Sequence, residues 1–289
     1  MNLISKLFYP ITGPIGFIQR NFKTVFFLTI LYFIFTNSDT QNLEKPNLQI
    51  IELNGPIMVV DEVLEKIEKA KSDINIQGVL LKVNSPGGAV APSIEVAYAI
   101  KELNEIKPVV AYASGIMASG SYYASIWANK IVANPGSMIG SIGVIMQSAD
   151  ASELMSKIGI KTQIVKTGKY KESGTPTRQW TKEEREELEK VTQNTYDMFI
   201  TDVSNARNLK KEDHQIYADA HIFTSSQAKE VGLIDIVGTI STAKLELIDL
   251  SKTQNPIWSK EDKMDKFMEK MLQNSIMNIT TNLNGLMAN

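Results

Sequence analysis

The sequence contains no cysteine and only two histidines, His214 and His221, among its 289 residues. The first absence excludes disulfides, thiolate nucleophiles and cysteine-ligated zinc or iron–sulfur sites. The second excludes a metal site built from three histidines. Net charge is also small, because 30 Lys and Arg face 32 Asp and Glu, and this balance gives no electrostatic reason to expect nucleic acid as a partner. We therefore expect no metal and no cofactor, in a chain whose 43% hydrophobic residues suffice for a folded core.

Acidic residues are missing from the first 38 positions, where the charged residues are Lys6, Arg20 and Lys23. Within this stretch Val25–Phe35 reads VFFLTILYFIF, and with a threonine at each end it makes a helix of about 20 Å against a hydrocarbon core of about 30 Å. An uncleaved anchor, a cleaved signal peptide and an interfacial or buried helix all fit this segment. We favour the anchor, because small residues of a cleavage site do not follow it. Basic residues before it and acidic residues after it predict a cytoplasmic N-terminus.

The remaining chain alternates strand-like and helical segments. We expect an anchor and linker over residues 1–45, an α/β domain over 46–250 and an amphipathic tail over 251–289. The alternation predicts a mostly parallel sheet. Thr181 and Glu184 stand three apart as a capping box, which predicts the start of a long helix that runs to Asn205. The expected strands are Leu48–Asn54, Gln77–Val83, Pro108–Ala113 and Lys130–Ala133, and the other expected helices are Val60–Ala70, Ala91–Leu103 and Ala118–Trp127.

Two glycine-containing loops follow predicted strands and could hold chemistry. Gly87 and Gly88 end the loop NSPGG, where backbone N–H groups could point into a cleft and bind an oxyanion. Ser119 stands at a strand-to-helix turn with Gly120 after it, so its hydroxyl could act as a nucleophile beside the Gly120 N–H. Taken alone, each loop is more typical of a plain turn or a helix cap than of a functional site.

A serine nucleophile needs a base, and the sequence offers histidine or lysine. His214 lies in the charged run KKEDHQ and His221 precedes a strand-like pair, and neither has an evident orienting partner. The stretch from Ile164 to Arg178 is expected to form a strand and then a glycine-containing loop with three lysines. Spacing alone does not separate a catalytic lysine from three surface lysines, which are Lys166, Lys169 and Lys171.

Five motifs occur together in the order and spacing of the signal peptide peptidase A family, which the chain resembles over residues 48–248. The resemblance implies a ClpP/crotonase-like fold of repeated ββα units and a membrane-anchored bacterial serine endopeptidase with a Ser-Lys dyad. It also implies a homo-oligomeric ring whose sites are completed between protomers. The motifs are NSPGG (84–88), ASGSYY (118–123), GSIGV (140–144), GKYK (168–171) and TSSQAKEVGLID (224–235).

Carried over by position, the resemblance assigns roles to individual residues. Ser119 corresponds to the nucleophile, Lys171 to the general base, and Ser141 to the hydroxyl that orients the lysine. The glycines that correspond to backbone contacts with the oxyanion or the substrate are Gly87, Gly88 and Gly120. The expected substrates are remnant signal peptides and other apolar peptides, cleaved through an acyl-enzyme. The expected location is the bacterial inner membrane, with the catalytic domain on the periplasmic side.

Two positions depart from the family pattern. Ser121 replaces the second glycine of ASGGYY, which would strain the backbone if the position requires positive φ. Ala220-His221 stands where Gly-Arg is common in the family. Two alternatives belong to other classes: a crotonase-like acyl-CoA enzyme, which would share the fold and the oxyanion glycines, and a catalytically silent membrane scaffold.

Overall fold

The computed structural model describes residues 21–36 and 45–259, and the chain divides between Lys45 and Pro46 into two units. The first unit contains helix α2 (Phe22–Thr36), in which the Thr29 hydroxyl donates to the Val25 carbonyl at 2.8 Å. Within these described ranges, no helix combines the length and the apolar character needed to cross a membrane. The membrane anchor therefore stays a prediction, and most of the predicted tail lies outside the described residues.

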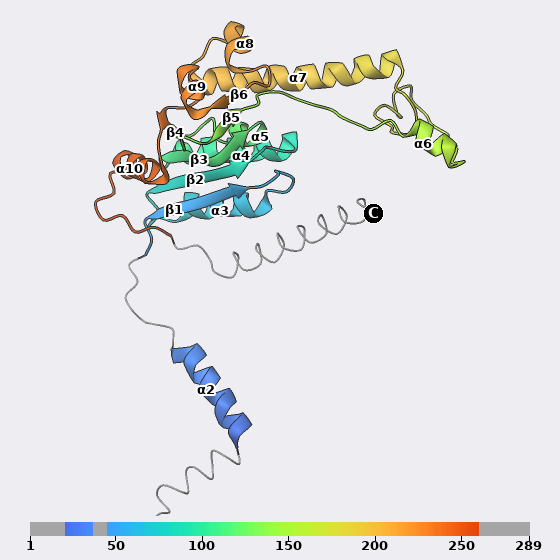
Figure 1. Ribbon diagram of the computed structural model, residues 1–289. Helices are drawn as coiled ribbons and strands as arrows, with labels where there is room; N and C mark the ends of the chain where they lie inside the picture. The colour runs from blue at the N-terminus through green and yellow to red at the C-terminus, as the bar shows by residue number, and fades with distance from the viewer. Residues whose placement is uncertain (1–20, 37–44, 260–289) are drawn as a thin grey trace, which may run out of the picture. The chain divides into compact units, whose positions relative to one another are not determined.

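The second unit is built on one sheet of seven strands, ordered β1-β2-β3-β4-β7, with β5 joined to both β3 and β6 (Figure 1). All paired strands run parallel except β5 and β6, which confirms the predicted mostly parallel sheet. The strands are β1 (Leu48–Asn54), β2 (Gly78–Ser85), β3 (Val109–Ala118), β4 (Lys130–Ala133), β5 (Met138–Gly140), β6 (Ile222–Thr224) and β7 (Ile236–Val237).

Strand β3 has two partners along one edge, because its first half pairs with β4 and its last three residues pair with β5. The pairing of β3 with β2 is irregular after Val83, where Asn84 lies beside the bulge. The Asn84 side chain accepts from the Ile116 N–H at 3.1 Å. A β-carbon on Gly115 would lie 2.5 Å from the Asn84 Oδ1 atom, so a side chain there would push Asn84 out of this contact. The bulge directs the end of β3 toward β5.

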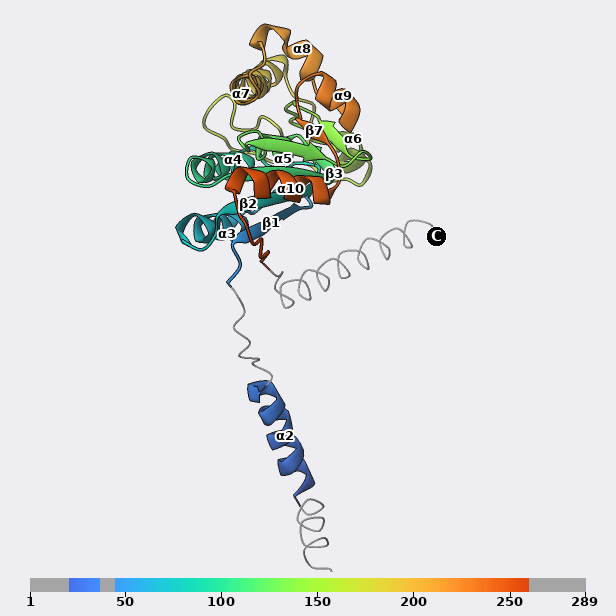
Figure 2. The ribbon, with the colours of Figure 1, turned by 90° about the vertical axis from the view of Figure 1, so that its left-hand side faces the viewer.

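Helices cover both faces of the sheet (Figure 2). Helices α3 and α4 pack on one face against alternate strand residues such as Ile51, Leu81 and Ala111. Helix α10 packs on the other face against Leu80 and Val110. The alternation of buried residues along each strand therefore gives both faces an apolar core. The helices are α3 (Asp61–Ser72), α4 (Val90–Asn104), α5 (Gly120–Tyr123), α6 (Ser152–Lys157), α7 (Lys182–Arg207), α8 (His214–Tyr217), α9 (Ser225–Glu230) and α10 (Ile240–Ser251), and Lys211–Asp213 form a short 3₁₀ turn.

Residues 144–181, here called the arm, leave the sheet after β5 and return at the first turn of α7. Figure 1 shows α6, the one helix that the structure gives the arm, standing away from the sheet near the start of α7. The predicted strand after Ile164 is wrong, because this part of the arm pairs with no strand in the described chain and Val165 is fully exposed. The apolar residues of this segment have the sequence pattern of a strand, but among the residues that the structure describes there is no neighbouring strand to form hydrogen bonds with its backbone.

Candidate active site

Ser119 occupies a strained turn at the end of β3. Its φ is 52° and its ψ is −124°, a backbone conformation that favours glycine. The Ser119 N–H donates to the Gly140 carbonyl at 2.8 Å, which fixes the turn against β5. The half-buried serine thus stands where a strand passes abruptly into a helix, a geometry that exposes a nucleophilic hydroxyl.

Two backbone donors lie beside this serine. Gly88 forms a parallel bridge with Ile57 that uses the Gly87 carbonyl and the Ala89 N–H, so the Gly88 N–H faces away from the bridge. The Gly120 N–H is the first of α5 and has no partner in its helix. Neither N–H donates to an acceptor in the described part of the chain. A β-carbon on Gly120 would lie 3.4 Å from the Gly88 nitrogen, so the two donors are neighbours and could bind one oxyanion together.

Gly87 provides space rather than a donor. Its φ is +93°, and its N–H already donates to the Ser85 hydroxyl at 3.2 Å. A β-carbon on Gly87 would lie 2.6 Å from the Gly120 nitrogen and 2.8 Å from the Ser119 β-carbon. The absence of a side chain therefore lets the NSPGG loop approach the serine turn closely.

Ser121 joins the same two loops. Its fully buried hydroxyl contacts the Ser85 carbonyl at 2.6 Å and the Ala118 carbonyl at 2.9 Å, and it accepts from the Ala118 N–H at 2.9 Å. Ser121 is not among the residues with positive φ, so this departure from the family pattern adds no backbone strain. The hydroxyl instead ties the end of β2 to the end of β3.

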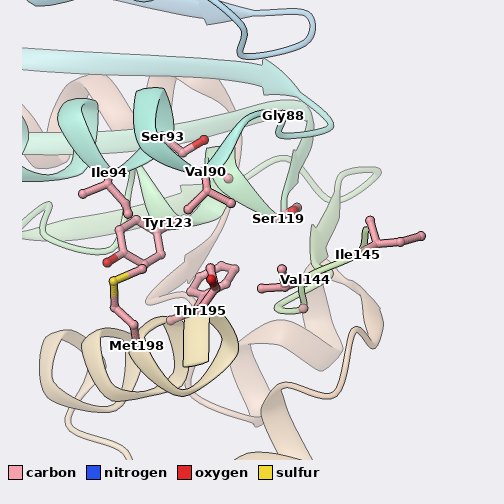
Figure 3. Close-up of a pocket in the computed structure, with 13 residues that line it drawn as sticks. Gly88, Val90, Ser93, Ile94, Ser119, Tyr123, Val144, Ile145, Thr195 and Met198 are labelled. Carbon is pink, nitrogen blue, oxygen red and sulfur yellow. The ribbon is translucent and has the colours of Figure 1, made fainter. Parts of the chain in front are cut away.

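A small pocket of about 90 Å³ opens beside Ser119 between the sheet and α7 (Figure 3). Apolar side chains of α4, of the segment after β5 and of α7 line most of it, so it suits an apolar group. Figure 3 shows Val90 and Ile94 on one side and Met198 of α7 on the opposite side. The lining residues are Gly88, Val90, Ser93, Ile94, Ser119, Gly120, Tyr123, Gly143, Val144, Ile145, Thr195, Met198 and Phe199.

Tyr123 forms part of this pocket and connects α5 to α7. Its hydroxyl donates to the Asp202 carboxylate, and its ring meets the Phe199 ring edge-on with centroids 4.8 Å apart. Burial, together with the hydrogen bond to Asp202, raises the pKa of the Tyr123 hydroxyl above its ordinary value. Tyr123 therefore stays protonated and holds one wall of the pocket in place.

Ser141 lies next to the serine turn along the sheet. Ala118 at the end of β3 pairs with Gly140 at the end of β5. The residues that follow these two strands, Ser119 and Ser141, are therefore neighbours. Ser141 also has a positive φ, 49°, and its N–H donates to the His221 carbonyl at 2.7 Å. Its backbone is thus held by the His221 carbonyl rather than by the histidine ring.

The Ala220-His221 pair shapes this segment through its backbone. Ala220 has a φ of 58°, and a β-carbon on Gly143 would lie 2.8 Å from the Ala220 β-carbon. The methyl group of Ala220 therefore packs where the GSIGV segment must lack a side chain. His214 contacts Tyr196 at 3.0 Å, and neither histidine lines the pocket of Ser119.

The three candidate lysines all lie in the exposed part of the arm and differ in their partners. Lys166 forms an ion pair with Glu172 at 2.8 Å, and Lys169 lies over the Tyr170 ring at 5.2 Å. The Lys171 amine has no hydrogen bond or ion pair within the described residues. Lys171 does not line the pocket of Ser119, so within one chain the structure does not bring the predicted nucleophile and base together.

Sequence reasoning overlooked two polar arrangements near these residues. One is the Tyr123–Asp202 contact, and the other is the network that joins Arg178 and Glu172 of the arm to Glu184 of α7. The capping box at Thr181 was a usable signal for Glu184, because that residue must face the start of α7. Asp202 gave no comparable signal, since its contact joins distant parts of the chain.

Comparison with known proteins agrees with this fold. Residues 101–254 match peptidase family S49. A putative protease of Methanocaldococcus jannaschii is 44% identical over 193 residues, which cover 67% of this chain and 61% of the relative. A putative protease of Synechocystis is 35% identical over 199 residues, covering 67% of this chain and 70% of the relative. A putative signal peptide peptidase SppA of Enterococcus faecium is 35% identical over 179 residues, 61% of this chain and 51% of that protein.

A mutant of the 1510-N membrane-bound stomatin-specific protease shares the fold, with a TM-score of 0.52 at 13% identity, covering 76% of this chain and all of that one. The likeness shows a shared α/β fold. The chain belongs to peptidase family S49, which confirms the resemblance to the signal peptide peptidase A family. The match spans about three fifths of the length of the first of these relatives.

Proposed function

We propose that this protein is a serine endopeptidase in which Ser119 attacks the peptide and Lys171 of a neighbouring copy acts as the base. The observation that carries the proposal is the pairing of a strained Ser119 with the unused N–H groups of Gly88 and Gly120. Membership of family S49 supports the reaction class. Lys171 does not line the pocket of Ser119 in its own chain, which supports a base supplied by a second copy.

Each step has a residue to perform it. A neutral Lys171 amine accepts the Ser119 proton as the hydroxyl oxygen attacks the peptide carbonyl carbon, and the Gly88 and Gly120 N–H groups bind the oxyanion. The C–N bond then breaks, and the lysine returns the proton to the leaving amine. Water, activated by the same lysine, hydrolyses the ester and regenerates the serine. Lysines have a reference pKa of about 10.4, so only about one in 10³ is neutral near pH 7 in water and the site must exclude water.

The second copy explains how such a lysine could lose contact with water. The arm exposes many large apolar side chains, and covering them against a neighbour would remove both these side chains and the amine from solvent. A head-to-tail contact of this kind closes into a ring when the rotation permits. The expected homo-oligomer thus supplies the dyad. The exposed apolar residues of the arm are Ile145, Met146, Leu154, Ile158, Ile160, Ile164, Val165 and Tyr170.

The proposed substrates are apolar peptides such as remnants of signal peptides. The pocket beside Ser119 supports this choice, because Val90, Ile94, Val144 and Met198 offer an apolar surface to one substrate side chain. We also propose that α2 anchors the protein in the inner membrane of a bacterium with the peptidase unit on the periplasmic side. An anchored enzyme would meet apolar peptides at the membrane surface.

Subunit mixing tests the shared site. Full-length Ser119→Ala and Lys171→Ala are each expected to be inactive against a fluorogenic apolar peptide. Co-expressed in equal amounts, they should recover about a quarter of the wild-type activity, because about one contact in four pairs an intact serine with an intact lysine. Lys169→Ala serves as the matched control and should stay active.

Four results contradict the proposal. Activity in either single variant removes that residue from the dyad. Inactivity of the mixture, with both variants present in one oligomer, refutes a base supplied in trans. Binding of an acyl-CoA without acylation of Ser119 would favour the crotonase-like alternative, and a folded oligomer that never acylates Ser119 would favour the scaffold.

A further inference from the structure

A network of charged side chains fixes the residue next to Lys171. The Arg178 guanidinium donates to both carboxylate oxygens of Glu184, at 2.7 and 2.8 Å, and to Glu172 at 3.0 Å. The Lys166 amine donates to the same Glu172 oxygen at 2.8 Å. Glu172 directly follows Lys171 in the chain, so the network begins one residue from the proposed base.

The network is attached to a rigid element. Glu184 is buried with 3% exposure and completes the capping box of α7, because its carboxylate accepts from the Thr181 N–H at 2.9 Å. A bidentate contact between arginine and a carboxylate sets direction as well as distance. Arg178 therefore holds Glu172 to the first turn of α7, the helix whose later turns line the pocket.

The same contacts leave the Lys171 amine without a carboxylate. Glu172 forms ion pairs with Lys166 and Arg178. A backbone hydrogen bond, followed by the Thr181 side chain and then the charge of Lys169, lowers the pKa of Glu183 on the first turn of α7. The hydrogen bonds from Arg178, followed by that from Lys166, lower the pKa of Glu172. A carboxylate beside a lysine favours the protonated amine, which cannot act as a base. A lysine base at position 171 therefore requires that the Glu172 carboxylate bind other cations, here Lys166 and Arg178.

We propose that Arg178 is a positioning residue with two effects. It holds Glu172 away from Lys171, and it fixes the loop that contains Lys171 to the first turn of α7. This inference rests on the proposed role of Lys171 as the base. Arg178 touches neither the substrate nor Ser119, and it acts on catalysis through its neighbours in the arm. Loss of the guanidinium leaves Glu172 held by Lys166 without Arg178, and the less restrained carboxylate then turns toward the Lys171 amine.

The pH dependence of activity tests the proposal in the full-length oligomer. Arg178→Gln should move the rising limb of the kcat/KM profile to higher pH by about one unit, and so lower activity near neutral pH about tenfold. In the double variant Glu172→Gln with Arg178→Gln, the rising limb should return toward its wild-type pH, because no carboxylate remains at position 172. Arg185→Gln, an exposed residue one helical position beyond Glu184, is the matched charge control and should leave the profile unchanged.

Subunit mixing then locates the effect. Arg178→Gln mixed with Ser119→Ala should regain activity, because the Ser119→Ala copies supply intact arms. Arg178→Gln mixed with Lys171→Ala should not, since neither copy supplies an intact arm. A merely structural role for Arg178 would lower stability without moving the limb, and such a result overturns the proposal.

Two further results keep the test decisive. If Arg178→Gln does not fold, Arg178→Lys replaces it, because a single ammonium cannot hold both glutamates in the same geometry. An unchanged limb in Arg178→Lys overturns the proposal. Activity in Lys171→Ala refutes the proposed function itself, whereas an inactive Lys171→Ala combined with an unmoved limb in Arg178→Gln refutes only the inference about Arg178.

Discussion

The Ser119 N–H and the Gly140 carbonyl form a 2.8 Å hydrogen bond across the ends of β3 and β5. This contact holds the serine turn from the side of the sheet that also carries Ser141. The glycine loop before α4 approaches from the other side through Gly87. The turn is thus fixed by two segments that are more than fifty residues apart, and its strain is maintained by both.

Relief of the backbone strain at Ser119 should stabilise the fold. Ser119→Gly removes the β-carbon that opposes a φ of 52°, so we expect the free energy of unfolding to rise by about 1 kcal/mol. Ser119→Ala removes the same hydroxyl but keeps the strain and should show no such gain. Chemical denaturation of both variants measures the difference, and equal stabilities would contradict strain at this turn.

A side chain at Gly120 should disturb the site in a way that a second substitution relieves. The new β-carbon of Gly120→Ala would lie 2.2 Å from the Ser93 hydroxyl oxygen, so this variant should lose most of its activity. Adding Ser93→Ala removes that oxygen and leaves a contact of 3.0 Å with the Ser93 β-carbon. The double variant should therefore regain part of the activity and stability, and a double variant no better than the single would disprove this clash.

Loss of the Ser121 hydroxyl should destabilise the protein. Ser121→Ala leaves buried backbone groups of Ala118 and Ser85 with fewer partners, at a cost of about 1–3 kcal/mol. Thermal unfolding should show a lower Tm. Ser72→Ala, which removes an exposed hydroxyl in α3, is the matched control and should change the Tm little. Similar Tm values for the two variants would argue against a structural role for Ser121.

The Arg178 network should stabilise the protein only while its glutamates are ionised. Hydrogen bonds from Arg178 lower the pKa of Glu184 to about 2, below the value of about 4.3 for an unfolded glutamate. The contribution is therefore complete above about pH 5 and decreases as pH falls through about 4.3 toward about 2. The Tm difference between wild type and Arg178→Gln should be constant near neutral pH and shrink in acid. A difference that grows in acid would contradict this linkage.

Local sequence signals located most elements. The strands Leu48–Asn54 and Lys130–Ala133 have the predicted bounds, and α7 begins after Thr181 with the predicted capping box. These features depend on neighbours in sequence. The expected helix over 118–127 shortens to Gly120–Tyr123, because the following residues form successive turns with i to i+3 hydrogen bonds before β4 begins at Lys130.

Long-range relationships could not be predicted in the same way. The sequence indicated Ser119, Gly88 and Gly120 as residue types in loops, but their shared geometry depends on the bridge between Gly88 and Ile57. Nothing in the local pattern around Ile164 distinguishes a strand from an exposed segment of the arm. The difference lies in whether another strand is adjacent, and that is a property of the whole fold.

The outer edge of β1 has a consequence for how the chain can be shortened. The Leu48 N–H donates to the Ile257 carbonyl, the Ser259 N–H donates to the Leu48 carbonyl, and the Ile50 N–H donates to the Ser259 hydroxyl at 3.1 Å. Residues 257–259 thus shield the first backbone groups of an edge that could otherwise pair with another molecule. Ending the chain at Ser251, where α10 stops, would expose this edge and promote aggregation, whereas ending it after Ser259 would keep the sheet closed at that point.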